Sequence, residues 1–260
     1  DLEQKYPEFI TPDSSTQRVG GKPLEKFEKV RHFIPMLSFN DAFSEKDMTD
    51  WLERISKLLN KEERKEINLY CELKIDGLAI ELIYANGIFK TGSTRGDGII
   101  GENVTQNLKT IEAIPLKLRE KEEILKDLKS LTTHYQLPTT IIARGEVFIS
   151  KKEFEKLNKE KQKKKLPPFA NPRNVAAGSI RQLNPKVTAQ RRLDSFAYDL
   201  VSPARLASQG EAGGDFRQKT HEEEHLILKA FGFKTNPHNK YCKSLKEVFE
   251  FHQWWQKKRE

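Results

Sequence analysis

Lys74 and Asp76 are the residues whose types and spacing could do covalent chemistry. They stand in the run Lys74-Ile75-Asp76-Gly77, which closes a short apolar stretch. A neutral lysine amine can attack phosphorus and form a phosphoramidate with a nucleotide. Free lysine titrates near ~10.4, so this lysine would have to be desolvated or crowded by positive charge. At a strand end Asp76 would face the same side as Lys74 and could orient the amine or hold a metal ion, and Gly77 would leave room for a nucleotide. Taken alone, the tetrapeptide is more typical of a surface ion pair.

Further motifs surround this run in a fixed order. They are the segments 30–40 (VRHFIPMLSFN), 71–80 (CELKIDGLAI), 94–98 (TRGDG), 101–105 (GENVT), 144–148 (RGEVF) and 169–183 (FANPRNVAAGSIRQL). In this order, and over almost the whole chain, they resemble the adenylation domain of bacterial-type NAD-dependent DNA ligases. The families that use ATP usually carry an arginine two residues after the glycine of the lysine motif. Here that position is Ala79, which favours NAD as the AMP donor.

The resemblance implies a fold and a reaction. The fold would be α+β, a nucleotidyltransferase fold of mainly antiparallel sheets flanked by helices. Lys74 would take AMP from NAD with the help of Mg2+ and expel nicotinamide mononucleotide. AMP would pass to the 5′-phosphate of a nick in double-stranded DNA, and the nick would then be sealed, as replication and repair require. The expected partners are adenine nucleotides and nicked DNA, and a monomer is expected.

The same resemblance assigns residues to the nucleotide. Glu72 would recognise the adenine amino group, since a carboxylate can accept from an exocyclic amine. Arg95 would contact ribose or phosphate, and Glu146 would accept from the ribose hydroxyls. Ser38 and Phe39 align with a Ser-Leu pair that lines the adenine pocket, and Phe39 departs from that pair.

Arg173 and Arg181 bracket a predicted short helix that begins near Asn171 and Pro172. Helix amides and guanidinium groups suit an anion, and the family uses these arginines on phosphates and at the nick. The small residues between them, Gly178 included, predict close packing. The five lysines of residues 159–165 are interpreted as a solvated helix end.

Histidine and cysteine spacing predicts no structural metal site. His221 and His225 lie four apart on a predicted helix, but the glutamates at 222–224 indicate a solvated face, so no zinc is assigned. Cys71 and Cys242 match no zinc or disulfide spacing, which favours a reducing, cytoplasmic compartment.

Composition sets the outer bounds. The chain has 260 residues, a net charge of +8 and a pI of about 9.2, which favours a polyanionic partner. No apolar stretch approaches the roughly 20 residues of a membrane helix, and the amino terminus does not read as a signal peptide. Residues 1–40 are expected to be an irregular lead-in from an amino-terminal mononucleotide-binding module. Residues 41–260 would be the adenylation domain, truncated before the last two lysine motifs of the family.

Local patterns predict the elements. A helix is expected over 45–59, capped by Ser44 and with an apolar stripe in the core. Strands are expected over 69–73, 78–84, 88–93 and 141–148, with a hairpin turn at Asn86-Gly87. Ser150, Thr220 and Ser244 are predicted helix caps, and residues 202–215 a surface loop.

Two other functions stay open at this point. The chain could be an ATP-using RNA ligase or capping-type transferase, which mass spectrometry after incubation with NAD or ATP would distinguish. It could also be a non-catalytic basic module that binds nucleic acid, with Lys74 as a phosphate contact. That module would show steeply salt-dependent DNA binding and no covalent adduct.

Overall fold

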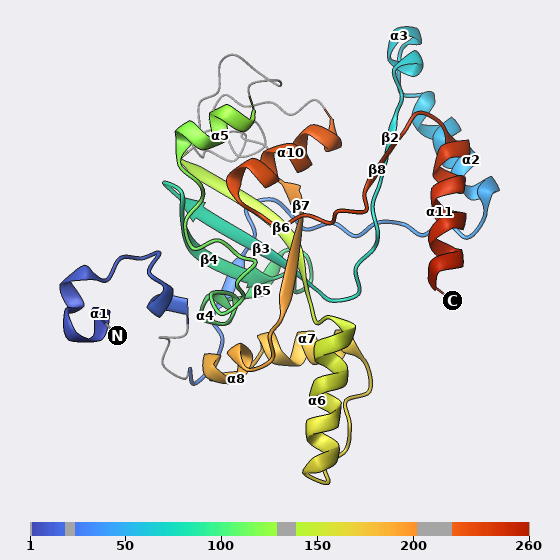
Figure 1. Cartoon of the computed structure of the whole chain (residues 1–260). Coiled ribbons are helices and arrows are strands. Elements are labelled where there is room, and N and C mark those ends of the chain that lie inside the picture. The colour runs from blue at the N-terminus through green and yellow to red at the C-terminus, as the bar shows by residue number, and fades with distance from the viewer. Residues whose placement is uncertain (1, 19–23, 129–138, 202–219, 260) are drawn as a thin grey trace. The chain divides into compact units, whose positions relative to one another are not determined.

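The computed structural model describes residues 2–18, 24–128, 139–201 and 220–259 (Figure 1), and the predicted loop 202–215 lies outside them. The chain forms two compact units. Unit 1 comprises Asp1–Met36 and Ile75–Thr235, and unit 2 comprises Leu37–Lys74 and Asn236–Glu260. The expected division near residue 40 is not tested by these units and stays a prediction.

Unit 1 is built on a four-stranded antiparallel sheet in the order β4-β3-β6-β7. Its strands are β3 (Leu78–Ala85), β4 (Ile88–Thr94), β6 (Thr140–Phe148) and β7 (Asp194–Leu200). Asn86 and Gly87 join β3 to β4 with φ values of 49° and 75°. A two-residue turn with both φ positive matches the right-handed twist of the strands, so the predicted hairpin is confirmed.

One face of this sheet carries the main core. Ile80, Leu82 and Tyr84 alternate along β3 and are buried on it. Four helices add buried apolar side chains to the same core, and α5 and α10 are seen together in Figure 1. These helices are α4 (Thr105–Leu108), α5 (Lys121–Asp127), α7 (Pro172–Ile180) and α10 (His221–Phe231).

The opposite face of the sheet holds charged side chains inside apolar strands. Glu81 on β3 and Arg144 on β6 are register partners and both are buried. Ile34 packs on this face with Ile142 and Val201, so part of the segment 32–36 covers it.

Smaller elements complete unit 1. β5 pairs with β1, and directly after β5 the backbone N–H of Asn103 donates to the carbonyl of Glu28. Ser150 caps α6 by accepting from the backbone N–H of Glu153. The elements are α1 (Leu2–Lys5), the 3-10 turns η1 (Pro7–Phe9) and η2 (Ser15–Arg18), β1 (Lys29–Arg31), β5 (Ile100–Glu102), α6 (Lys151–Lys163) and α8 (Pro185–Ala189).

Unit 2 consists of three helices and a two-stranded antiparallel sheet. Ser44 and Asp47 form the capping box at the start of the first helix. The strand pair and the last helix pack together, and the last helix also contacts the first. The elements are α2 (Glu45–Ser56), α3 (Lys61–Lys65), β2 (Leu69–Cys71), β8 (Lys240–Cys242) and α11 (Leu245–Arg259).

The apolar stripe of α2 is not the core that its spacing predicts. No residue of α2 is buried, and Trp51 is 36% exposed. Phe43, expected to staple the first turn, is 91% exposed. The prediction was wrong because a small unit covers only part of an amphipathic face.

Cys71 and Cys242 lie side by side in unit 2, although the sequence spacing indicated no pairing. They stand on the paired strands β2 and β8, and their sulfur atoms are 3.7 Å apart as free thiols. Burial, followed by the hydrogen bond to Cys242, raises the pKa of the Cys71 thiol to about 12. A sheet ladder between residues 171 positions apart leaves no local sequence signal.

The predicted fold class is confirmed: the described residues form an α+β structure with antiparallel sheets. Among the same residues, no helix combines the length and the apolar character needed to cross a membrane.

Candidate active site

Lys74 lies in the connection between β2 and β3, not at the end of a strand as predicted. β2 ends at Cys71, because its partner β8 is only three residues long. Lys74 and Asp76 are both exposed, so in this ligand-free chain burial does not desolvate the amine. The boundary between the two units falls directly after Lys74.

Gly77 fixes the entry of this connection into the sheet. A Cβ atom at this position would lie 2.1 Å from the carbonyl oxygen of Val147 and 3.0 Å from the Cγ atom of Glu146. Glycine is therefore required here by the close approach of β6, whereas the sequence indicated room for a nucleotide. The same approach brings Gly77 next to Glu146 within unit 1.

Substituting Gly77 with alanine should destabilise unit 1 by about 1 to 3 kcal/mol, because a backbone carbonyl cannot move aside as a flexible side chain can. Gly178 is the matched control: it lies in helix α7, and a Cβ there would meet nothing within 4 Å. Gly178→Ala should stabilise the helix by ~0.5 to 1 kcal/mol. Urea unfolding of both variants measures the difference, and equal midpoints would contradict the packing argument.

Asp76 forms an ion pair with Arg173, one of the two predicted phosphate ligands. Their atoms Oδ1 and Nη1 are 3.2 Å apart, and both side chains are more than half exposed. Arg173 lies in the first turn of α7, which begins where the sequence predicted, and its N-cap Asn171 accepts from the backbone N–H of Asn174. The predicted close packing is confirmed at Ala176, which is fully buried, and was wrong at Gly178, which is exposed.

Three of the strands align Arg95 and Glu146 on either side of Ala79. Glu146 on β6 is the register partner of Ala79 on β3. On the other side of β3, the backbone N–H of Arg95 donates to the carbonyl of Ala79 at 3.0 Å. The sheet thus aligns two predicted nucleotide ligands, Arg95 and Glu146, on the two sides of Ala79. Gly77, which lies close to β6, is two residues before Ala79 in the chain.

Arg95 begins a tight turn. Its carbonyl accepts from the backbone N–H of Gly98, and Gly96 and Gly98 have φ values of 57° and 94°. Asp97 stabilises the turn by accepting from the backbone N–H groups of Ile99 and Ile100 at 2.8 and 2.7 Å. The hydrogen bond from Ile100, followed by the one from Ile99, lowers the pKa of the Asp97 carboxyl group.

Tyr198 on β7 is a neighbour of Arg95 and Glu146 that the sequence analysis missed. Burial, and then the negative charge of Glu146, raises the pKa of its hydroxyl, while the positive charge of Arg95 lowers it. On the same strand Phe196 is the register partner of Glu146, and its ring lies 4.9 Å from that of Phe148. These aromatic residues add apolar surface beside Glu146.

Arg181, the second predicted phosphate ligand, is held by β5. Its Nε atom lies 2.5 Å from a carboxylate oxygen of Glu102, which also pairs with Lys29 at 3.7 Å. The hydrogen bond from Arg181 is the main cause that lowers the pKa of Glu102. Arg181 and Arg173 thus pair with different carboxylates, Glu102 and Asp76.

The remaining predicted ligands belong to unit 2. Glu72 accepts a hydrogen bond from the side-chain amide of Asn239 at 3.2 Å. Ser38 is exposed and Phe39 is 95% exposed. Their predicted contacts with adenine are not tested by the ligand-free unit.

A buried ion network lies on the charged face of the sheet in unit 1, and the sequence analysis did not find it. The guanidinium of Arg144 donates to one oxygen of Glu81 at 3.0 and 2.9 Å. The other oxygen of Glu81 faces Nδ1 of His32 at 2.8 Å. Charged residues inside the apolar strands 78–85 and 140–148 were the available signal.

This network continues toward α10. Asp199 lies 3.5 Å from Arg144, and burial, then the nearby charge of Glu224, raises the pKa of Asp199 to about 6. One carboxylate oxygen of Glu224 accepts from the backbone N–H of Leu200, and the other lies 2.8 Å from Nδ1 of His221. Asp199 therefore takes up a proton at a higher pH than an ordinary aspartate does.

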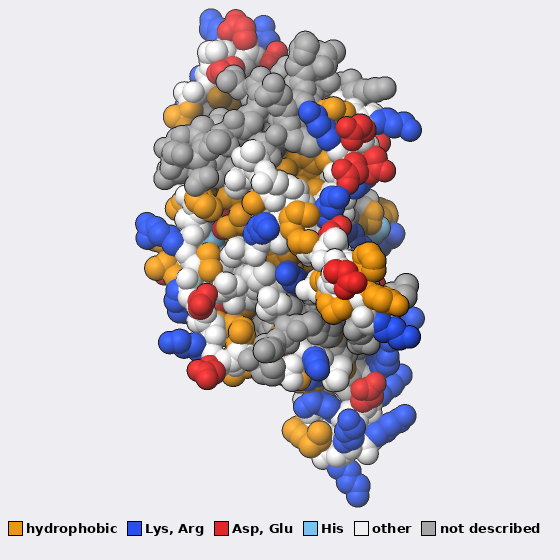
Figure 2. Space-filling view, turned by 90° about the vertical axis from the view of Figure 1, so that its left-hand side faces the viewer, with side chains coloured by type: hydrophobic (Ala, Val, Ile, Leu, Met, Phe, Trp, Pro, Cys, Tyr) orange, Lys and Arg blue, Asp and Glu red, His pale blue; other side chains and the backbone are white. Residues whose placement is uncertain are grey.

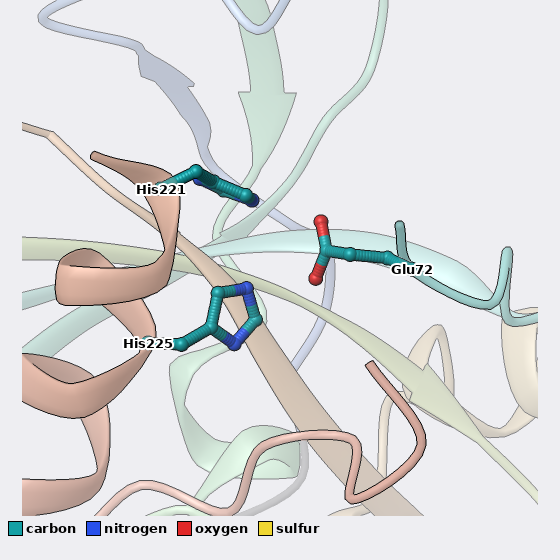
Figure 3. A group of neighbouring side chains, drawn as sticks. All are labelled: Glu72, His221 and His225. Atoms are coloured by element: carbon teal, nitrogen blue, oxygen red, sulfur yellow. The ribbon is translucent and has the colours of Figure 1, made fainter. Parts of the chain in front are cut away.

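Figure 3 shows His221 and His225 projecting from α10, with ring centroids 4.9 Å apart. His225 is 2% exposed and Glu224 is 7% exposed. The predicted solvated face was therefore wrong, because α10 packs this side against β7 and α5. Glu72, which the figure also labels, belongs to unit 2.

The lysines of residues 159–165 lie on the last turns of α6 and just beyond it. No residue of α6 is buried, and lysine and arginine side chains gather at the lower end of Figure 2, where α6 lies. Lys161 and Arg191 both lie over the ring of Phe169, at 4.1 and 5.1 Å from its centroid. The predicted solvated helix end agrees with this exposure.

Comparison with known proteins decides the family. The model of the NAD-dependent DNA ligase adenylation domain matches residues 24–260. The chain belongs to this family. It is 44% identical to a DNA ligase of Thermotoga neapolitana, over 100% of the chain and 33% of that relative. It is 48% identical to a DNA ligase of Thermoanaerobacter sp., over 96% of the chain and 33% of the relative. The chain thus spans about a third of the length of these curated relatives.

Proposed function

We propose that the chain carries out the adenylation step of an NAD-dependent DNA ligase, with Lys74 as the residue that receives AMP. The observation that carries this proposal is that, in a chain of this family, the sheet places Arg95 and Glu146 on the two sides of Ala79. Gly77 lies close to Glu146. This arrangement supports the view that the sheet aligns a cation and a carboxylate beside Gly77 of the lysine motif. A longer parent protein would complete the sealing of nicked DNA during replication and repair.

The chemistry assigns one step to each group. Neutral Nζ of Lys74 attacks the α-phosphorus of NAD, a P–N bond forms, and the P–O bond to nicotinamide mononucleotide breaks. The amine loses its proton to solvent or to a nearby carboxylate, and Glu72 and Asp76 each lie two residues from Lys74 in the sequence. Glu72 would accept from the adenine amine and Glu146 from the ribose hydroxyls.

Arg95 and Arg173 would counter the charge that grows on the phosphate. Fixed cations at that point stabilise the transition state more than the ground state. Arg173 is already ion-paired with Asp76, so a phosphate has to replace that carboxylate at the guanidinium. Arg181 would act later, on the DNA phosphate, after release from Glu102.

Mg2+ fits the donors of this site. It prefers one or two carboxylates together with phosphate oxygens. Asp76 precedes Gly77 in the chain, and the Cγ atom of Glu146 lies 3.0 Å from a Cβ placed at Gly77, so both could supply a carboxylate. When bound, the ion would neutralise phosphate charge.

Ala79 favours NAD over ATP within this proposal. The side chain at this position lies on the same strand face as Glu81, and its register partner is Glu146. An arginine there, as ATP-using families carry, would place a cation against the ribose-binding carboxylate. Intact-mass measurement after incubation with NAD or with ATP, each with Mg2+, tests the choice. An adduct with NAD alone is expected; an adduct with ATP alone, or none, would contradict the proposal.

Glu72→Ala should weaken nucleotide binding by about 1 to 3 kcal/mol with little change in melting temperature, because the lost acceptor would face adenine. Asn239→Ala is the matched control, since it removes the hydrogen bond at 3.2 Å and keeps the carboxylate. Nucleotide titration and thermal melting of both variants are compared. Equal losses of melting temperature with unchanged affinity would make Glu72 a structural residue.

A further inference from the structure

His32 faces a hydrogen-bond acceptor at each ring nitrogen. Nδ1 lies 2.8 Å from a carboxylate oxygen of Glu81, and Nε2 lies 3.0 Å from the backbone carbonyl of Arg95. A neutral imidazole has one N–H group, whereas the imidazolium has two. A carbonyl oxygen only accepts, so Nε2 donates to Arg95. A ring that lost one proton would keep a single N–H group, which the ionised carboxylate of Glu81 attracts more strongly than the Arg95 carbonyl does. The proton between His32 and Glu81 therefore decides both the charge of the ring and whether the bond to Arg95 forms.

The surroundings of Glu81 place that proton on His32. Arg144 directs two N–H groups at the second oxygen of Glu81, an arrangement that favours an ionised carboxylate. The side chains of His32 and Glu81 are fully buried, so neither can exchange its partner for water. One carboxylate thus lies between two buried cations.

Charged groups reach His32 from each element packed against it. Glu81 comes from β3 and Arg144 from β6, and Asp199 on β7 offsets Arg144 from 3.5 Å. Asp97 lies in the turn after β4. Its backbone hydrogen bonds are the main cause that lowers its pKa, and the positive charge of His32 adds a smaller effect in the same direction.

His32 also ties two backbone segments together. Its backbone N–H donates to the carbonyl of Ile99 at 2.9 Å, and Met36 donates to the carbonyl of Gly98 at 2.8 Å. The Nε2 bond ends on the Arg95 carbonyl, which the Gly98 N–H also reaches. Hydrogen bonds therefore hold the segment 32–36 against the turn that contains Arg95.

We propose that His32 remains protonated at neutral pH and acts as a positioning residue, which holds the Arg95 turn on the sheet through the Arg95 carbonyl. The role of Arg95 in this statement rests on the proposed function. The imidazolium itself does not, because it follows from contacts inside unit 1.

The balance of forces on His32 supports this reading. Burial is the largest influence and lowers the pKa of His32, but the hydrogen bond and charge of Glu81, with the bond to Arg95, outweigh it and the pKa is raised. The stability that this proton gives is full below about pH 6.5, the value of an unfolded histidine. It is lost as the pH rises through the raised folded-state pKa.

The first test measures the charge of His32 directly in the wild-type chain. Nitrogen chemical shifts of the imidazole in the labelled whole chain, assigned by their loss in His32→Gln, should show both nitrogens protonated at pH 7.5. In urea the same histidine should titrate near ~6.5. A neutral ring at pH 7.5, with the proton on Glu81, would overturn the proposal.

The second test links the proton to the site. In wild type, NAD affinity should fall as the pH rises through the His32 pKa seen by NMR. In His32→Gln affinity should be about tenfold lower, the worth of one charged hydrogen bond, without that pH step. His252→Gln, at an exposed position of α11, should behave as wild type. A pH step that persists in His32→Gln would overturn the positioning role. A wild-type chain that binds no NAD and forms no adduct would contradict the proposed function and leave the NMR result standing.

Discussion

Lys74→Arg is expected to abolish the AMP adduct and to leave the melting temperature unchanged. Arginine keeps the positive charge but stays protonated, so it offers no neutral amine for attack on phosphorus. Lys74 is exposed in a connection between strands, so a longer side chain meets no packing constraint. Intact-mass spectra after incubation with NAD and Mg2+ measure the adduct.

Lys65→Arg is the matched control for this variant. Lys65 is an exposed lysine at the end of α3, in the same unit as Lys74. It should leave adduct yield at the wild-type level. A normal yield of adduct in Lys74→Arg would remove Lys74 as the nucleophile, whatever the result for Lys65.

Glu81→Ala is expected to be the most destabilising of the substitutions considered, by about 3 to 5 kcal/mol. The alanine removes the acceptor shared by Arg144 and His32 and leaves two cationic groups in the interior without their carboxylate. A buried charge that loses its partner keeps its desolvation cost and loses the attraction that offset it.

Asp127→Ala provides the comparison with an exposed pair. Asp127 lies 2.5 Å from Arg119, but both side chains are more than a third exposed and Arg119 keeps Glu123 as a second partner. Solvent screening makes such pairs weak. Urea unfolding should show a large loss for Glu81→Ala and little change for Asp127→Ala; similar losses would contradict the buried network.

The local features of the fold could be predicted from the sequence. Asn86-Gly87 sets its own turn, and Ser44, Ser150 and Asn171 cap helices a few residues away. In each case the signal and the structure that it determines lie within one helical turn or one hairpin. The α+β class followed from such elements and from the resemblance to the ligase family.

The features that the sequence did not indicate depend on distant partners. Cys71 meets Cys242 through a three-residue ladder, and the short length of that ladder also moves Lys74 out of the strand. His32 and Arg144 reach Glu81 from 49 and 63 residues away. Alternation along a strand sets the face on which a side chain lies, but only the register of β3 with β6 makes Glu81 and Arg144 partners.

The site was predicted in composition more than in arrangement. Arg95 and Glu146 were named from their motifs, and the sheet aligns them about Ala79. Arg173 and Arg181 were predicted from their motif as phosphate ligands, and in the structure each pairs with a carboxylate, Asp76 and Glu102. A motif specifies a residue type, whereas the partners of a surface arginine depend on how the elements pack.

The most direct test of the account locates AMP on the chain. After incubation with NAD and Mg2+, the protein is digested and the modified peptide is sequenced by tandem mass spectrometry, with and without prior acid treatment that cleaves a P–N bond. The account predicts AMP on Lys74, removed by acid. AMP on another residue, an acid-stable linkage, or no modified peptide at saturating NAD would contradict it.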